Sequence, residues 1–221
     1  MLVAPSGSGK TTITSALLER FPQVFGYSVS ATTRRPRPGE LDGTAYHFLT
    51  REAFERRRQA GEFLEWAEYA GALYGTLKSE VDEVLRHGRH VLLDIEVNGA
   101  RQVRRANSSV IGIFVIPPSP DVLIERLRKR RTESEAALQK RLEIAVHEVI
   151  TAQQDVRAGI FFDHILVNDD LETVVREVVR IVNEPDVKKH ETMDMMRLLA
   201  NFVEKLVLEA ESLKRISKGN N

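Results

Sequence analysis

Short apolar runs alternate with charged stretches that have apolar residues at helical spacing. The apolar runs predict strands over 1–3, 27–31, 45–49, 91–95, 111–116 and 161–167. The amphipathic stretches predict helices over 13–20, 51–60, 78–86, 123–145 with a break near 131–134, 143–157 and 171–182. Residues 71–76 predict a turn. Strands separated by helices are typical of an α/β fold with a parallel, doubly wound sheet.

The last stretch, 191–216, predicts one further helix. Its apolar residues recur near heptad spacing: Met193, Met196, Leu199, Phe202 or Val203, Leu206, Ala210 and Leu213. About three heptads are short for a self-sufficient coiled coil. Three alternatives stay open, namely a helix packed on its own domain, a helix that joins copies of the chain, and a helix that binds another partner.

Composition narrows the function classes. The chain has 221 residues and 42% hydrophobic content, and lysine plus arginine (32) equals aspartate plus glutamate (32). The balanced charge gives no indication of nucleic-acid or membrane binding, and no apolar run approaches the roughly 20 residues of a membrane helix. The absence of cysteine fits a reducing compartment. We therefore expect a cytoplasmic protein.

The first twelve residues contain the strongest motif. An apolar run meets Ala4-Pro5-Ser6-Gly7-Ser8-Gly9-Lys10-Thr11-Thr12, and a helix follows. This order is typical of a phosphate-binding P-loop, in which backbone N–H groups and a helix N-terminus face the anion. Lys10 can reach the β- and γ-phosphates, and the Thr11 hydroxyl can ligate Mg²⁺. An ordinary helix-capping turn is the alternative, and Ala4 stands where the usual motif has glycine.

Two other features of the chain affect the interpretation. Only three residues precede Ala4, fewer than a central strand usually has, and we expect further residues upstream of Met1. The stretch 32–40 contains three arginines, two prolines and a glycine. It is either a solvated surface turn or an anion clamp, because arginine guanidinium groups match phosphate oxygens two at a time.

Several separated motifs together resemble guanylate kinase. They are 5–11 (PSGSGKT), 28–40 (SVSATTRRPRPGE), 61–66 (GEFLEW), 74–76 (YGT), 93–96 (LDIE) and 167–170 (VNDD). The resemblance covers residue 2 to about 183 and implies a P-loop kinase fold, with three layers and a parallel central sheet. It also implies a kinase-like domain over 1–184: a core of 1–29, 78–125 and 146–184, an inserted GMP-binding subdomain near 30–77, and a helical lid near 126–145. Residues 185–221 would be a C-terminal helical extension.

The resemblance implies transfer of the γ-phosphoryl group of ATP to GMP in purine nucleotide metabolism, with Mg²⁺. The GMP phosphate would be held by Ser30, Arg34, Arg37, Tyr46 and Tyr74, and the base would be read by Glu65 and Thr76 with Asp94 on the same edge. A carboxylate can accept from both the N1–H and the exocyclic amine of guanine, and adenine offers no such donor pair. The two tyrosines could instead be ordinary core aromatics.

ATP would lie on Ser6, Gly7, Ser8, Gly9, Lys10, Thr11, Thr12 and Asn168, with Thr11 as the metal ligand. The catalytic charges would come from Lys10, Arg34 and the lid arginines Arg126, Arg130 and Arg141. Either Arg130 or Arg131 is the lid contact, because the family has glycine after the first of them. The stretch after Val167 could equally cap the next helix, and the arginines could form a solvated helix face.

Three hypotheses follow. The first is an active guanylate kinase whose partners are GMP and ATP, with no nucleic acid or membrane, and with a homodimer or higher homo-oligomer through the C-terminal helix. The second is a binding module of the same fold without turnover, which Lys10 and Thr11 disfavour. The third is a kinase for another phosphorylated acceptor, such as a ribose phosphate, which Glu65 and Thr76 disfavour.

Overall fold

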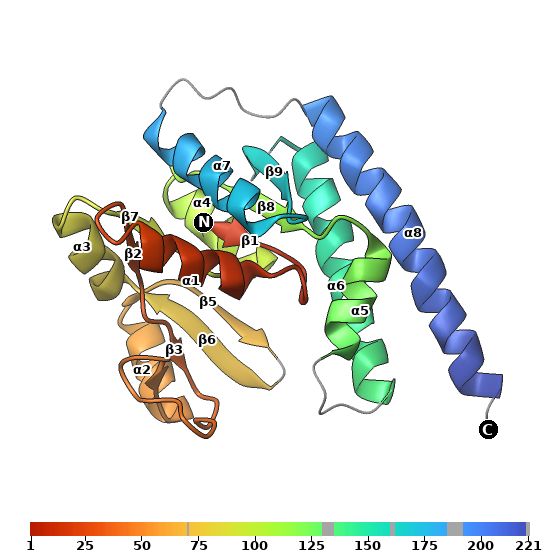
Figure 1. Ribbon diagram of the computed structural model, residues 1–221. Helices are drawn as coiled ribbons and strands as arrows, with labels where there is room; N and C mark the ends of the chain where they lie inside the picture. The colour runs from red at the N-terminus through yellow and green to blue at the C-terminus, as the bar shows by residue number, and fades with distance from the viewer. Residues whose placement is uncertain (70, 130–134, 160–161, 185–191, 220–221) are drawn as a thin grey trace. The chain divides into compact units, whose positions relative to one another are not determined.

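The computed structural model describes residues 1–69, 71–129, 135–159, 162–184 and 192–219. Within them the chain forms two units, which we describe separately (Figure 1). The first unit contains Met1 and Thr14–Val110, and the second contains Leu2–Ile13 and Ile111–Asn221. No helix in the described ranges is both long enough and apolar enough to cross a membrane.

The second unit contains a parallel three-stranded sheet in the order β1-β8-β9. The strands are β1 (Leu2–Val3), β8 (Ile113–Ile116) and β9 (His164–Val167). Nearly all of their residues are buried, as expected for a parallel sheet. Because parallel strands end at the same edge, the residues that follow β1 and those that follow β9 come together there.

Four helices of the second unit follow the predicted pattern. They are α5 (Pro120–Arg128), α6 (Glu135–Arg157), α7 (Leu171–Asn183) and α8 (Thr192–Gly219). Ser119 caps α5 and Asp170 caps α7, each by accepting a hydrogen bond from a backbone N–H of the first turn. The predicted break at 131–134 lies outside the described residues.

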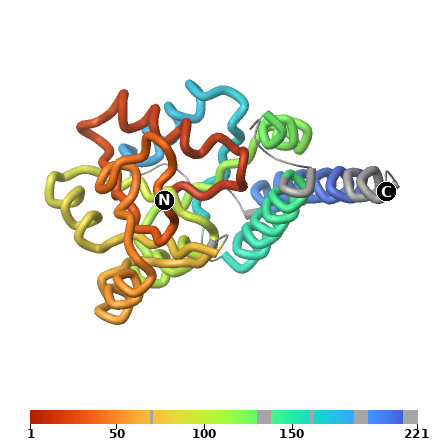
Figure 2. The backbone as a smooth tube through the Cα atoms, turned by 90° about the horizontal axis from the view of Figure 1, so that it is seen from below, coloured from red at the N-terminus to blue at the C-terminus, as the bar shows by residue number. Residues whose placement is uncertain are grey.

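Helix α8 packs against α6 and α5 (Figure 2). Its buried side chains are Met195, Leu199, Phe202, Leu206 and Ala210. The prediction of Met193 in this row is wrong, because Met193 is 74% exposed and Met195 occupies the inward position one turn before Leu199. The arrangement agrees with a helix packed on its own domain. Association of copies of the chain through α8 stays a prediction, and the side chain of Leu213 lies outside those described.

The first unit contains a four-stranded sheet in the order β4-β3-β6-β5. The strands are β3 (Ala31–Thr32), β4 (His47–Phe48), β5 (Phe63–Tyr69) and β6 (Ala72–Leu77). The pair β5–β6 is an antiparallel hairpin, and β3 pairs antiparallel with β6 and parallel with β4. Helix α2 (Arg51–Gln59) contributes Phe54 to a core beneath this sheet, where its ring stacks on Phe63 at 4.3 Å between centroids.

The rest of the first unit consists of a parallel pair and three helices. Strand β2 (Phe25–Tyr27) pairs with β7 (His90–Leu92). Helix α1 (Lys10–Arg20) begins in the second unit and continues into the first. Helix α3 (Lys78–Arg86) has the predicted bounds, and α4 (Val97–Ala106) packs against β5.

Three predictions about elements need correction. The run 27–31 is not one strand, because β2 ends at Tyr27 and β3 begins at Ala31 in a different sheet. Residues 71–76 are not a turn, because only Gly71 adopts a positive φ while Gly75 continues β6. The hydrophobic pattern also misses α4, whose first turn contains the turn-favouring residues Asn98 and Gly99.

Candidate functional site

The loop between β1 and α1 has the backbone of a phosphate-binding loop. Gly7 and Gly9 have φ of 90° and 87°, a region that side chains rarely adopt. The N–H of Ser8 donates to the carbonyl of Pro5 at 3.1 Å, and α1 begins at Lys10. A Cβ on Gly9 would overlap the Asn168 amide nitrogen, so glycine is required here twice, by conformation and by space. The predicted loop geometry is therefore present.

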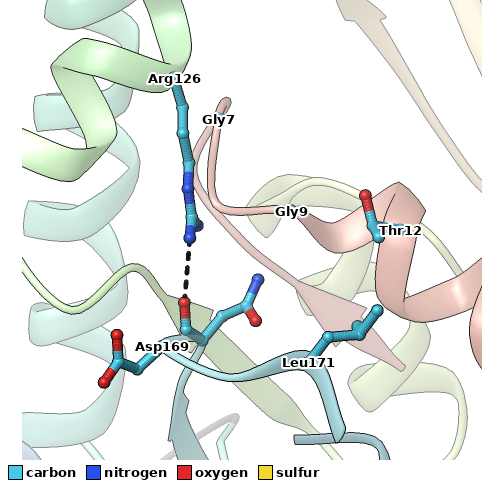
Figure 3. A pocket seen from close by; sticks show the side chains of 7 residues that line it. Gly7, Gly9, Thr12, Arg126, Asp169 and Leu171 are labelled. Carbon is cyan, nitrogen blue, oxygen red and sulfur yellow. Dashed lines mark hydrogen bonds between the residues drawn. The ribbon is translucent and has the colours of Figure 1, made fainter.

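A hollow of about 360 Å³ opens beside this loop (Figure 3). Its lining is Gly7, Gly9, Thr12, Arg126, Asn168, Asp169 and Leu171. The Asn168 side chain is buried and donates to the carbonyl of Ser8 at 2.7 Å, while its own backbone carbonyl accepts from Arg126 Nη2 at 3.3 Å. Five predicted residues thus line one cavity, and Asn168 fastens β9 to the loop.

The remaining residues of the predicted ATP site lie on the same unit. Lys10 and Thr11 are the first two residues of α1, Lys10 half-buried and Thr11 exposed, and Ser6 donates its N–H to Glu148 Oε2 at 3.3 Å. The second guanidinium nitrogen of Arg126, Nη1, is buried and has no hydrogen-bond partner among the described residues. Arg141 is half-buried on α6. Arg130 and Arg131 lie outside the described residues.

The arginine-rich loop of the first unit is organised by Glu40. Arg34 donates to both carboxylate oxygens of Glu40 at 2.9 Å, and the N–H of Arg37 donates to the same carboxylate at 2.7 Å. The hydrogen bond from Arg34 lowers the pKa of Glu40 below its ordinary value, and the Arg37 N–H lowers it further. The loop therefore has a defined shape, with the Arg37 side chain exposed.

Aromatic rings surround the Arg34 guanidinium. The central guanidinium carbon, Cζ, lies 5.3 Å from the ring centroid of Tyr46 and 5.7 Å from the ring centroid of Phe48. The rings of Tyr46 and Tyr74 meet edge to face at 6.0 Å. Burial raises the pKa of the Tyr46 hydroxyl, and the neighbouring Tyr74 and Asp94 raise it further. The Tyr46 phenol therefore stays a neutral hydrogen-bond donor at physiological pH, which suits an anionic ligand.

Ser30 lies just before β3, and its backbone carbonyl bonds to the neighbouring strand β4. That carbonyl accepts from the N–H of His47 at 2.9 Å. Since Ala31 pairs with Gly75 in the antiparallel register, Ser30 lies at the level of Thr76. The fold thus brings the predicted phosphate-binding residues Ser30, Arg34, Tyr46 and Tyr74 into one region of the first unit.

Glu65 and Thr76 form a buried pair. They are cross-strand partners on β5 and β6, and the Thr76 hydroxyl donates to Glu65 Oε1 at 2.6 Å. Glu65 is 5% exposed and Thr76 is 1% exposed. Asp94 follows β7 in the same unit, and its charge acts on Tyr27. Burial raises the pKa of the Tyr27 hydroxyl, and the charge of Asp94 raises it further. A buried carboxylate with a defined orientation is suited to reading paired N–H donors.

Three residues that the sequence analysis does not single out contact this region. Glu40 ends the arginine-rich motif and could have been found as its only acid. Gly99 lies against Glu65, and Gln102 bonds to the backbone beside it. Both belong to α4, and no local pattern indicates them.

Comparison with known proteins agrees with this geometry. Residues 1–185 match the profile of the guanylate kinase family. The chain belongs to the guanylate kinase family. A guanylate kinase from Synechocystis sp. is 47% identical over 186 residues, which are 84% of this chain and 93% of the relative. A guanylate kinase from Rubrobacter xylanophilus is 49% identical over 178 residues, 80% of this chain and 89% of the relative.

A solved structure leads to the same family. The crystal structure of guanylate kinase from Anaplasma phagocytophilum matches with a TM-score of 0.64 and 30% identity, over 85% of each chain. The predicted family and the predicted P-loop kinase fold are therefore confirmed. The family match ends at residue 185, so α8 lies beyond it.

Proposed function

We propose that this chain transfers the γ-phosphoryl group of ATP to GMP, giving ADP and GDP. The observation that carries the proposal is the buried Glu65–Thr76 pair, joined at 2.6 Å. Membership of the guanylate kinase family supports the same reaction.

Guanine recognition follows from the acceptor character of Glu65. Its carboxylate can accept from both N1–H and the exocyclic 2-amine of guanine, whereas the corresponding edge of adenine has no such pair. The Thr76 hydroxyl already donates to one carboxylate oxygen and so fixes the orientation of the group. Asp94, whose charge acts on Tyr27 and Tyr46 in the same unit, adds a second acceptor on this side.

The GMP phosphate is assigned to the arginine loop and the two tyrosines. Arg34 carries a planar guanidinium that already binds a carboxylate through two parallel bonds, the geometry that also suits phosphate. Arg37 adds an exposed cation on the same loop. The remaining phosphate contacts in this proposal are the hydroxyls of Ser30, Tyr46 and Tyr74.

ATP is assigned to the P-loop, where Lys10, Thr12 and the N–H groups of 7 and 9–11 would face the phosphates. Arg126 supplies charge beside the cavity, since its Nη1 is buried and has no partner among the described residues. Arg141 and Arg130 would add to it. The attacking phosphate oxygen is already anionic, so positioning and charge neutralisation carry the rate and no general base is needed.

Mg²⁺ fits the Thr11 hydroxyl at the start of α1. No cluster of three acidic or histidine ligands exists among the described residues. Such a cluster is not required, because Mg²⁺ is usually bound by one or two protein oxygens together with substrate phosphates and water. When bound, the ion neutralises phosphate charge during transfer.

The deciding experiment is an acceptor panel. ADP formation from ATP and Mg²⁺ is measured with GMP, AMP, CMP, UMP, a ribose phosphate or no acceptor, one at a time. Turnover with GMP alone is expected. GMP binding without turnover would instead favour the binding-module alternative, and turnover with a ribose phosphate in place of GMP would favour the other kinase.

Two variants test the assignments on each half of the site. Lys10→Ala should abolish GMP-dependent ATP turnover, because it removes the cation that reaches the β- and γ-phosphates. Arg37→Ala should raise the KM for GMP and leave the KM for ATP unchanged. Turnover that survives Lys10→Ala, or an unaltered GMP KM in Arg37→Ala, would contradict the corresponding assignment.

The proposed role is the supply of GDP for GTP synthesis in the cytoplasm.

The proposal includes association of copies of the chain through the exposed side of α8, where Met193, Leu198 and Leu208 are accessible. Sedimentation of the parent chain and of a Met193→Glu variant would test this. An identical, monomeric profile for both would exclude it.

A further inference from the structure

Helix α4 contacts the backbone directly beside the guanine-reading carboxylate. The Gln102 side chain donates from Nε2 to the carbonyl of Trp66 at 2.7 Å and accepts from the N–H of Trp66 at Oε1, at 3.2 Å. Strand β5 lies at one edge of its sheet, so these two backbone groups face away from β6. One amide side chain thus takes the place of a neighbouring strand.

The same helix also contacts the carboxylate itself. A Cβ built on Gly99 would lie 2.5 Å from Glu65 Oε2 and 3.1 Å from Glu65 Cδ. No side chain at position 99 could occupy that space while Glu65 keeps its position. The other oxygen, Oε1, accepts from Thr76. The Glu65 carboxylate is therefore fitted between β6 on one side and the bare backbone of α4 on the other.

We propose that Gly99 and Gln102 are positioning residues for guanine recognition, with Gln102 fixing the backbone of β5 and Gly99 leaving room for the carboxylate. This inference rests on the proposed function, in which Glu65 reads the base. Neither residue touches the nucleotide in this proposal; both act through Glu65. The property that they set is discrimination by the 2-amino group, which GMP has and IMP lacks.

The first test is Gly99→Ala with steady-state kinetics for GMP, IMP and ATP. We expect the KM for GMP to rise at least tenfold, the GMP-to-IMP ratio of kcat/KM to fall by a similar factor, and the KM for ATP to stay within twofold. Alanine normally stabilises a helix interior relative to glycine, so a general helix defect does not explain this pattern. Arg105→Ala, an exposed residue of the same helix, is the matched control and should match the parent.

The second test separates the two hydrogen bonds of Gln102. Gln102→Leu removes both hydrogen bonds, whereas Gln102→Glu keeps the acceptor but places a carboxylate oxygen against the Trp66 carbonyl. Both variants should therefore lose GMP-to-IMP discrimination, and the loss for glutamate should be at least as large as that for leucine. Combining Gly99→Ala with Glu65→Gln should add little to the effect of Glu65→Gln alone, because residues that act through one group are not additive. Calorimetric GMP binding gives the same comparison without turnover.

The outcomes are distinguishable. If Glu65→Gln leaves GMP binding unchanged, the proposed guanine reader is wrong. If Glu65→Gln impairs GMP binding while Gly99→Ala and Gln102→Leu keep the parent's KM and ratio, the positioning inference is overturned. A fully additive double variant would overturn it as well. Should Gly99→Ala fail to fold, Gln102→Glu and Gln102→Leu decide the question by the same ratio.

Discussion

Asn168 offers the sharpest prediction on the ATP side, because one buried side chain connects β9 to the phosphate-binding loop. Its amide nitrogen donates to the Ser8 carbonyl at 2.7 Å across 160 residues of sequence. In Asn168→Ala that carbonyl loses its hydrogen-bond donor. The position is buried, because Asn168 is only 6% exposed. Losing such a bond and leaving a buried acceptor unpaired costs about 1–3 kcal/mol.

The loss should appear in nucleotide binding. If it falls on the conformation of the loop that binds phosphate, about 1–3 kcal/mol corresponds to roughly a 5- to 150-fold weaker ATP affinity. Titration calorimetry with a non-hydrolysable ATP analogue measures this directly. GMP affinity should not change, because the predicted GMP residues belong to the other unit.

Two comparison variants make the result interpretable. Asn168→Asp keeps the shape but places an acceptor against the carbonyl, so it should bind the analogue more weakly than Asn168→Ala. Val167→Ala changes the preceding residue, which is 38% exposed, and should bind like the parent. Analogue affinity within twofold of the parent in Asn168→Ala, together with an unchanged melting temperature, would refute the reasoning.

Three further predictions concern other parts of the chain. Thr76→Val removes the hydroxyl that donates to the guanine-reading carboxylate and should lower kcat/KM for GMP about tenfold or more, with recovery in Thr76→Ser, since a hydrogen bond to a charged group contributes about 1.5–3 kcal/mol. Leu206→Ala should lower the free energy of unfolding in urea by about 2–5 kcal/mol, whereas Leu208→Ala, 60% exposed on the same helix, should change it by less than about 0.5 kcal/mol. The hydroxyl and N–H of Thr173 lower the pKa of Asp170 at the start of α7, so its stabilising contribution is complete above about pH 4 and is lost as pH falls through the lowered pKa. The stability difference between the parent and Asp170→Asn should therefore shrink on acidification, and a constant difference would contradict the assignment.

Features set by local chemistry were predictable from the sequence. The P-loop follows from its glycines and lysine, and α3 has the predicted bounds of Lys78 and Arg86. The apolar run 91–95 also predicts a strand near its observed place, since β7 spans His90–Leu92. In each case the residues that determine the feature lie within one short segment, so the pattern contains the information.

Features set by contacts between distant segments were not predictable. Gln102 acts on a backbone 36 positions away, and Gly99 matters only because Glu65 lies against it. The pattern predicts a turn at the hairpin partner of β5 because glycine favours turns, whereas Gly75 is needed to accommodate the ring of Phe63. In α8 the inward row depends on which side meets α6, and Met195 rather than Met193 lies in it.

The bond between Gln102 and Trp66 has a consequence for solubility. An uncovered edge strand presents N–H and C=O groups to which a strand of another molecule can pair, and proteins avoid this by covering such edges. In β5 the backbone N–H and C=O groups of Trp66 are already bonded to the Gln102 side-chain amide. The side chain that orders the nucleotide site thus also blocks intermolecular strand pairing at this point, and Gln102→Leu would make the protein prone to aggregate as its concentration rises.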